Sequence, residues 1–150
     1  MTWTRKHFDD LTLHELYQLM ILRQEVFVVE QNCPYVDADG RDPVAHHLFA
    51  TDAAGICACT RLLAPGTSYP AYCSIGRVVT APRVRRTGLG RELMRRSMTA
   101  CRELFPEAPL KISAQCYLDA FYRELGFAPT GEEYLEDGIP HRAMVLEEGA

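Results

Sequence analysis

Residues 74–90, SIGRVVTAPRVRRTGLG, decide the fold of this chain. Their apolar, β-branched first half predicts a strand, which ends at Pro82. An arginine-rich loop then leads through Gly88 and Gly90 into an amphipathic helix. This order leaves free backbone N–H groups at a helix N-terminus, where phosphate oxygens bind readily. The stretch therefore predicts a strand–loop–helix unit that binds an anion.

Composition and length predict one folded domain. The chain has 150 residues, of which 47% are hydrophobic and 24% are charged, as in a soluble globular protein. We expect a single domain spanning residues 1–150, without linkers or repeats. No apolar run approaches the ~20 residues that span a bilayer, and the N-terminus lacks the apolar core of a signal peptide. A cytoplasmic protein that does not bind membranes is therefore expected.

The cysteines and histidines do not predict a metal site. The chain has six cysteines, none in a C-x-x-C pair: Cys33, Cys57, Cys59, Cys73, Cys101 and Cys116. We expect free thiols in a reducing compartment. Neither they nor His46 and His47 have metal-ligand spacing, and the Asp37-x-Asp39-Gly40 segment lacks the later ligands of a calcium loop.

Positive charge is concentrated in one short region. Six arginines and one glutamate lie between Arg83 and Arg96, in a chain whose net charge is −4. An acidic protein with one basic loop is suited to a small polyanion rather than to a nucleic-acid backbone. The loop also lacks aromatic residues that would stack on bases. We therefore expect no nucleic-acid partner.

Periodicity and capping signals predict the order β-α-β-β-β-α-β-α-β-β, a mixed α/β domain with one central sheet. Strands are expected at 3–7, 47–51, 56–63, 72–80 and 110–114, with two more between 127 and 146, and helices at 12–29, 88–105 and 117–125. Thr12 and Glu15 form a capping box at the start of the first helix. The predicted core-facing stripe of this helix is Leu13, Leu16, Tyr17, Met20 and Phe27.

Two motifs resemble those of the GNAT N-acetyltransferases. The Arg85-x-x-Gly88-x-Gly90 segment resembles the acetyl-CoA signature of that family, and residues 121–127, FYRELGF, resemble its second signature. Further segments are similar to the ElaA-like subgroup: 27–31, 33–35, 39–40, 75–79, 114–115 and 134–141. The resemblance extends from about Leu11 to Met144. It departs from the family at Arg86, where glycine is common.

This resemblance implies a GNAT fold, a central mixed β-sheet flanked by helices in the order β-α-(α)-β-β-β-α-β-α-β-β. It also implies transfer of an acetyl group from the cosubstrate acetyl-CoA to a primary amine, directly within a ternary complex and without a metal. The backbone N–H of Val78 would meet the thioester oxygen, and Tyr122 would act as general acid. The implied cosubstrate-binding residues are Val78, Val79, Thr80, Arg85, Arg86, Thr87, Gly88, Leu89, Gly90 and Tyr122.

The general base is left open by the sequence. Many relatives carry a glutamate where this chain has Ser74, which cannot accept the proton. The alternatives are a water molecule or one of Glu30, His47, Glu136, Asp137 and His141. We rank Glu30 and His141 first, because both lie in segments typical of the subgroup.

The acceptor is also left open, with a polyamine, an amino acid, an antibiotic and a protein N-terminus all compatible. One hypothesis is that acidic residues line a pocket for a cationic amine: Glu30, Asp37, Asp39, Asp42, Glu132, Glu133, Glu136 and Asp137.

Alternative functions are a non-catalytic acyl-CoA sensor and an acyl-homoserine-lactone synthase. A ping-pong route through Cys116 is a further alternative mechanism. Exposed strands near the C-terminus leave a homodimer open.

Overall fold

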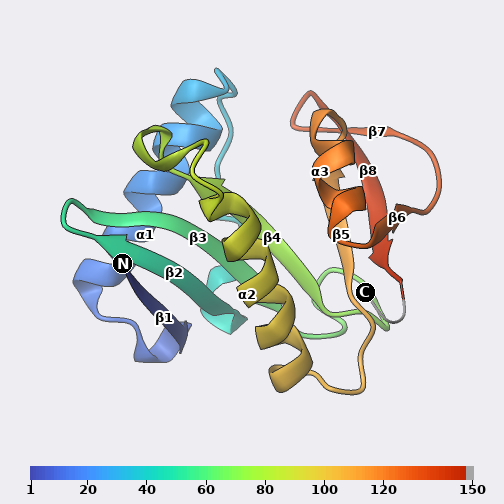
Figure 1. The fold of residues 1–150 in the computed structure, drawn as a ribbon, viewed down its shortest axis with the longest axis horizontal. Helices are drawn as coiled ribbons and strands as arrows, with labels where there is room; N and C mark the ends of the chain where they lie inside the picture. Colours follow the sequence, from blue (N-terminus) through green and yellow to red (C-terminus); the bar gives the residue numbers. More distant parts are fainter. Residues whose placement is uncertain (148–150) are drawn as a thin grey trace.

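The computed structural model of the chain describes residues 1–147, so residues 148–150 of the predicted domain lie outside it. The first half forms a four-stranded antiparallel sheet in the order β1-β2-β3-β4 (Figure 1). Its strands are β1 (Thr2–His7), β2 (His46–Asp52), β3 (Gly55–Leu63) and β4 (Ser74–Thr80). Each predicted strand of this half is confirmed to within two residues at its ends.

The first helix begins as predicted but presents a different face to the sheet. The Thr12 hydroxyl accepts from the Glu15 N–H (3.1 Å), and the Glu15 carboxylate accepts from the Thr12 N–H (2.8 Å). The helix α1 (Leu13–Arg23) continues as π-helical turns, η2 (Gln24–Glu30). The predicted stripe is wrong at Leu13 and Tyr17, which are 86% and 69% exposed.

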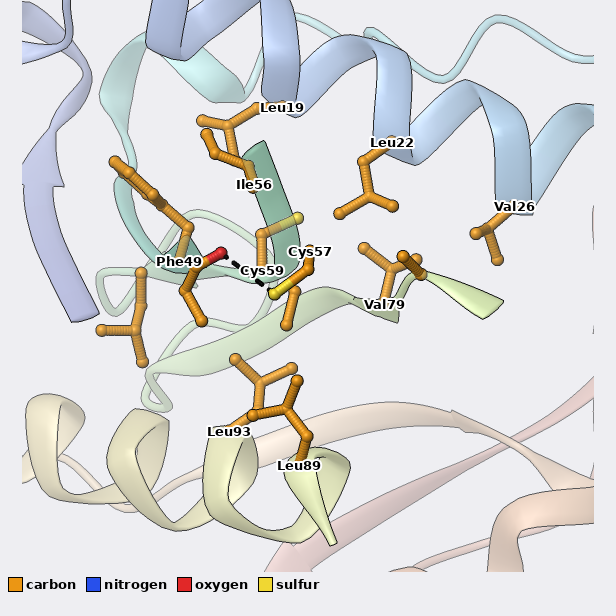
Figure 2. Close-up of a cluster of buried hydrophobic side chains, with 14 of the residues drawn as sticks. Leu19, Leu22, Val26, Phe49, Ile56, Cys57, Cys59, Val79, Leu89 and Leu93 are labelled. Carbon is orange, nitrogen blue, oxygen red and sulfur yellow. Dashed lines mark hydrogen bonds between the residues drawn. The ribbon is translucent and has the colours of Figure 1, made fainter. Parts of the chain in front are cut away.

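Phe27 is buried as predicted, together with a neighbouring stripe of α1 and η2: Leu19, Leu22, Arg23 and Val26. The two stripes have the same helical period, so periodicity alone does not distinguish them. Figure 2 shows Leu19, Leu22 and Val26 on one side of the sheet, with Leu89 and Leu93 of α2 (Leu89–Leu104) on the other. The first sheet is therefore covered by a helix on each face.

The cysteine thiols are free, as predicted. Cys57 Sγ donates to the Ala50 carbonyl at 3.5 Å, the dashed contact in Figure 2. Burial raises the pKa of Cys59 to about 12, so this thiol is a small core residue rather than a nucleophile.

The second half is a smaller antiparallel sheet in the order β5-β8-β6, with β7 also paired to β8. Its strands are β5 (Lys111–Gln115), β6 (Phe127–Pro129), β7 (Tyr134–Glu136) and β8 (Ile139–Leu146). The helix α3 (Asp119–Glu124) ends at Gly126, whose φ is 103°. The region after Phe127 thus holds three strands rather than the predicted two, because β6 and β7 are separate short strands.

Short 3-10 turns connect these elements: η1 (Phe8–Asp10), η3 (Asp42–Val44), η4 (Pro82–Val84) and η5 (Cys116–Leu118). Among residues 1–147, no helix combines the length and apolar character needed to cross a membrane.

The two sheets meet at a single parallel bridge between Cys73 and Leu110. The Lys111 N–H donates to the Cys73 carbonyl there, at 3.0 Å. Beyond this bridge β4 and β5 diverge toward their C-terminal ends (Figure 1). The predicted central sheet is therefore two antiparallel sheets that share one parallel contact.

Candidate active site

A cavity of about 890 Å³ is lined by both of the diverging strands, β4 and β5, and by the loops around them. It brings together these predicted site residues: Glu30, Val78, Val79, Thr80, Arg85, Gly90, Tyr122 and His141. The predicted bases Glu136 and Asp137 also line it. Residues 86–89 belong to the adjoining loop and helix start and are not part of its lining. Residues far apart in sequence thus form one site.

A β-bulge shapes the wall formed by β4. Val79 pairs with Cys59, but Gly76 rather than Arg77 pairs with Arg61, so β4 holds one extra residue here. Arg77 adopts a φ of 50°, in the left-handed region. The bulge takes Val78 out of the regular ladder and leaves it lining the cavity. The sequence gives no signal of this bulge, because Arg77 rather than a glycine carries the positive φ.

The loop before α2 has the geometry expected of an anion-binding turn. Gly88 caps the helix with a φ of 84°, and no atom lies within 4 Å of an added Cβ at Gly88 or Gly90. The first N–H groups of the helix lack intrahelical acceptors, and the helix dipole adds positive potential there. Arg86 has a φ of 64°, in the left-handed region that glycine adopts more readily than other residues.

Arg85 is held by Glu30 and by the end of β4. Its guanidinium donates to both Glu30 carboxylate oxygens, at 2.5 and 2.7 Å, and to the Thr80 carbonyl at 3.1 and 3.3 Å. The hydrogen bonds from Arg85 hold the pKa of Glu30 below its usual range. Glu30 is therefore an ionised partner of a cation, which makes it a weaker proton acceptor.

Tyr122 lies on α3 and is 5% exposed. Its ring makes edge contacts with Phe121 and Phe127, with ring centroids 5.2 and 6.0 Å away. Burial raises the pKa of Tyr122 well above its ordinary value. The hydroxyl is therefore protonated at neutral pH, as a proton donor requires.

His141 on β8 is 6% exposed and has a defined tautomer. Its Nδ1 lies 2.7 Å from the Ile139 carbonyl, an atom that only accepts, so Nδ1 carries the proton. In the neutral ring Nε2 then carries the lone pair, and it lies 3.4 Å from a Glu136 carboxylate oxygen. The ring stacks on Tyr134 with centroids 6.2 Å apart. This arrangement is suited to accepting a proton at Nε2.

Two other predicted groups are less suited to chemistry. His47 does not line the cavity: it is 2% exposed, contacts the Asp42 carbonyl at 3.1 Å, and has its pKa lowered by burial. Cys116 also lies outside the lining, and burial together with the Glu133 carboxylate raises its pKa. A raised pKa disfavours the thiolate that a ping-pong route needs.

Three aspartates in the segment after η2 belong to an internal ion-pair network. Three aspartates and three arginines pair within 2.7–3.4 Å: Asp37 with Arg23 and Arg77, Asp42 with Arg23 and Arg61, and Asp39 with Arg61 and Arg77. The hypothesis that these aspartates line an acceptor pocket is therefore wrong, because buried guanidinium groups need them as counter-charges. The sequence signal for this network was Arg61, a charge inside an apolar strand.

The β7–β8 turn closes one side of the cavity. Asp137 and Gly138 have φ values of 52° and 77°, and Cys33 Sγ donates to the Asp137 carbonyl at 3.0 Å. This contact ties the second sheet to the loop that follows η2. Within residues 1–147, no three His, Cys, Asp or Glu side chains are placed to hold a metal ion.

Comparisons with known proteins agree with this geometry. A family model described as an acetyltransferase (GNAT) domain matches residues 35–148. The crystal structure of an acyl-CoA N-acyltransferase from Pseudomonas aeruginosa has a TM-score of 0.91 and 46% identity, over 98% of this chain and 100% of that one. Escherichia coli ElaA is 37% identical over 97% of this chain and 95% of its own length, and its crystal structure has a TM-score of 0.90. A UPF0039 protein of Synechocystis is 40% identical over 97% of this chain and 95% of its own length.

Proposed function

This chain belongs to the GNAT acetyltransferase family, and from this premise we propose its activity. The resemblance of the sequence to the GNAT family and the predicted acyl-CoA N-acyltransferase fold are both confirmed. The proposed reaction is transfer of an acetyl group from acetyl-CoA to a primary amine, within a ternary complex and without a covalent enzyme intermediate.

One observation carries the proposal. Four separate elements bring Val78, Gly90, Tyr122 and His141 to the lining of one cavity. These residues supply a strand amide beside a bulge, an open helix N-terminus, a buried proton donor and a proton acceptor. Acyl transfer to an amine needs this combination of groups.

The residues present fit the cosubstrate. The loop from Arg85 to Gly90 would hold the pyrophosphate, because its backbone N–H groups are unobstructed by any Cβ at Gly88 or Gly90. The backbone of Val79 and Thr80 would bind the pantetheine arm. When bound, acetyl-CoA supplies an acetyl group activated as a thioester.

The proposed proton transfers use His141 and Tyr122. His141 Nε2 accepts a proton from the acceptor ammonium, and the nearby Glu136 carboxylate stabilises the resulting imidazolium. The amine lone pair then forms the new C–N bond at the thioester carbon, while the Val78 N–H donates to the thioester oxygen. As the C–S bond breaks, Tyr122 donates its proton to the departing thiolate, and the second proton that the nitrogen loses as the amide forms returns the Tyr122 phenolate to its neutral state. Glu30 is the second candidate base, but its pairing with Arg85 favours His141.

The test is release of free thiol from acetyl-CoA over a panel of primary amines. Tyr122→Phe and His141→Gln should each lower kcat by about 10²–10⁴-fold, with CoA affinity unchanged in calorimetry. Tyr17→Phe, at an exposed position on α1, is the matched control and should retain full activity. Tight CoA binding without turnover on any amine would instead support the acyl-CoA sensor.

A further inference from the structure

We infer that Gln115, Glu136 and His141 form a site for the ammonium group of the acceptor, which is therefore a primary amine bound as a cation. This inference rests on the proposed function and names how its acceptor is recognised. Gln115 and His141 face each other as cross-strand partners on β5 and β8. Glu136 approaches from β7, and all three residues line the cavity.

Each of the three side chains offers a hydrogen-bond acceptor at this end of the cavity. Gln115 Nε2 lies 3.5 Å from Gln31 Oε1, which leaves Gln115 Oε1 buried without a donor among the described residues. His141 donates through Nδ1 to the Ile139 carbonyl, so in the neutral ring its Nε2 is an acceptor. The carboxylate oxygen of Glu136 that faces this Nε2 at 3.4 Å is also an acceptor. A ligand with N–H donors would satisfy these three acceptors.

Glu136 is held in place although its side chain is 48% exposed. The Tyr134 hydroxyl bonds to Ser113 Oγ, which lies 3.5 Å from Glu136 Oε1. This chain of contacts leaves Oε2 of Glu136 directed at His141. The carboxylate is thus a fixed member of the site rather than a solvated surface charge.

The charge around this site favours a cation. The guanidinium groups of Arg61 and Arg77, which also line the cavity, are neutralised by ion pairs with Asp39 and Asp37 respectively. Arg41 contacts Ser68 rather than a carboxylate of the site. The carboxylates of Glu136 and Asp137 therefore give this end of the cavity a net negative character, which attracts an ammonium ion.

The number of donors explains why a primary amine is preferred. A primary ammonium carries three N–H donors, one for each of the three acceptors, whereas an alcohol carries one. A site built to hydrogen-bond such a group rejects analogues that lack it, because its buried polar atoms are then left unpaired. The donor directed at His141 Nε2 is also the proton that the reaction removes.

The experiment compares two probes of equal chain length, n-hexylamine and hexan-1-ol, on the full chain saturated with CoA. Long-range ¹H–¹⁵N NMR should show His141 protonated at Nδ1 alone, and hexylamine but not hexanol should shift its Nε2 resonance. Gln115→Leu and Glu136→Gln should each weaken hexylamine binding by at least about tenfold. With turnover, Gln115→Leu should raise KM for the amine and leave kcat unchanged, whereas Glu136→Gln should raise KM and also lower kcat, because Glu136 stabilises the His141 imidazolium as well.

Two variants separate loss of the site from loss of the fold. Gln115→Glu keeps an acceptor and should retain amine binding, while Glu133→Gln changes a carboxylate that pairs with Arg142 and should have no effect. Equal shifts by hexanol and hexylamine, or unchanged amine binding in Gln115→Leu and Glu136→Gln, would overturn the inference. Failure of CoA to bind, with hexylamine still shifting His141 in the unloaded protein, would overturn the proposed function and leave the ammonium site supported.

Discussion

Arg85 and Glu30 form a two-point ion pair in the wall of the cavity, with N–O distances of 2.5 and 2.7 Å, although 55 residues separate them in sequence. The same guanidinium donates to the Thr80 carbonyl at the end of β4. Glu30 thereby fixes an arginine of the proposed phosphate-binding loop against the strand. Its side chain is committed to positioning Arg85, which supports the proposal that His141 rather than Glu30 is the base.

Substitution of these two residues should separate their roles. Glu30→Gln should preserve the shape of the pH–rate profile and raise KM for acetyl-CoA, because Arg85 loses its ionic partner. His141→Gln should lower kcat by about 10²–10⁴-fold. The measurement is kcat and KM between pH 5 and pH 9. If the pH–rate profile of Glu30→Gln lost its acidic limb, Glu30 rather than His141 would be assigned as the general base.

Local signals in the sequence predicted much of this arrangement. The capping box at Thr12, the start of α2 after Gly88 and the end of α3 at Gly126 each depend on a few neighbouring residues, and each is confirmed. The motif resemblance likewise identified residues that the fold brings to one cavity. A cytoplasmic location remains a prediction.

Features that depend on distant partners were not predictable in this way. The bulge at Arg77 is stabilised by ion pairs with Asp37 and Asp39, which lie in another loop. The buried face of α1 depends on which of two apolar stripes meets the sheet. Gln115 belongs to a recognised segment, but its unpaired acceptor becomes visible only beside His141.

The two glycines of the phosphate loop should respond differently to alanine. Gly88 has a φ of 84° with open space around it, so Gly88→Ala adds backbone strain of about 1–2 kcal/mol without a clash. Gly90 lies within α2 and outside the left-handed region, so Gly90→Ala should leave stability unchanged or raise it by up to about 1 kcal/mol. Its methyl group would nevertheless occupy the space through which the pyrophosphate approaches.

We therefore expect Gly90→Ala to lower CoA affinity by at least about tenfold while retaining the wild-type melting temperature. Gly88→Ala should lower the melting temperature. Calorimetry with CoA and thermal unfolding measured by circular dichroism distinguish the two effects. Unchanged CoA affinity in Gly90→Ala would argue against pyrophosphate binding at this turn.

The ion-pair network should make a large contribution to stability. Arg23 is 2% exposed and binds Asp37 and Asp42, each at 2.7 Å. Removing one partner of a buried pair costs about 3–5 kcal/mol. Arg23→Met should fall near the lower limit, about 3 kcal/mol, because Arg61 and Arg77 still contact these aspartates. Urea unfolding measures the loss, with the exposed Arg95→Met as a control expected to stay within about 0.5 kcal/mol of wild type.

The same network predicts that acid destabilises the protein. Hydrogen bonds from Arg61 and Arg23 hold the pKa values of Asp39 and Asp42 below their usual range, despite the opposing effect of burial. The stability from these carboxylates is present above their unfolded pKa of about 3.9 and is lost as the pH falls through their folded values. Burial lowers the pKa of His47, so below about pH 6.5 the unfolded state takes up a proton that the folded state does not.

The aspartate carboxylates and His47 both reduce the stability of the folded state as the pH falls. The melting temperature should be constant between about pH 7 and pH 8, fall gradually below about pH 6.5, and fall more steeply below about pH 4. His47→Asn should reduce the slope between pH 6.5 and pH 4 and retain the steep acidic part, because Asp39 and Asp42 remain paired. Thermal unfolding from pH 8 to pH 3 in matched ionic strength checks this result. A melting temperature that rises as the pH falls from 6.5 to 4 would contradict the depressed pKa of His47, since that pKa requires the unfolded state to bind the extra proton.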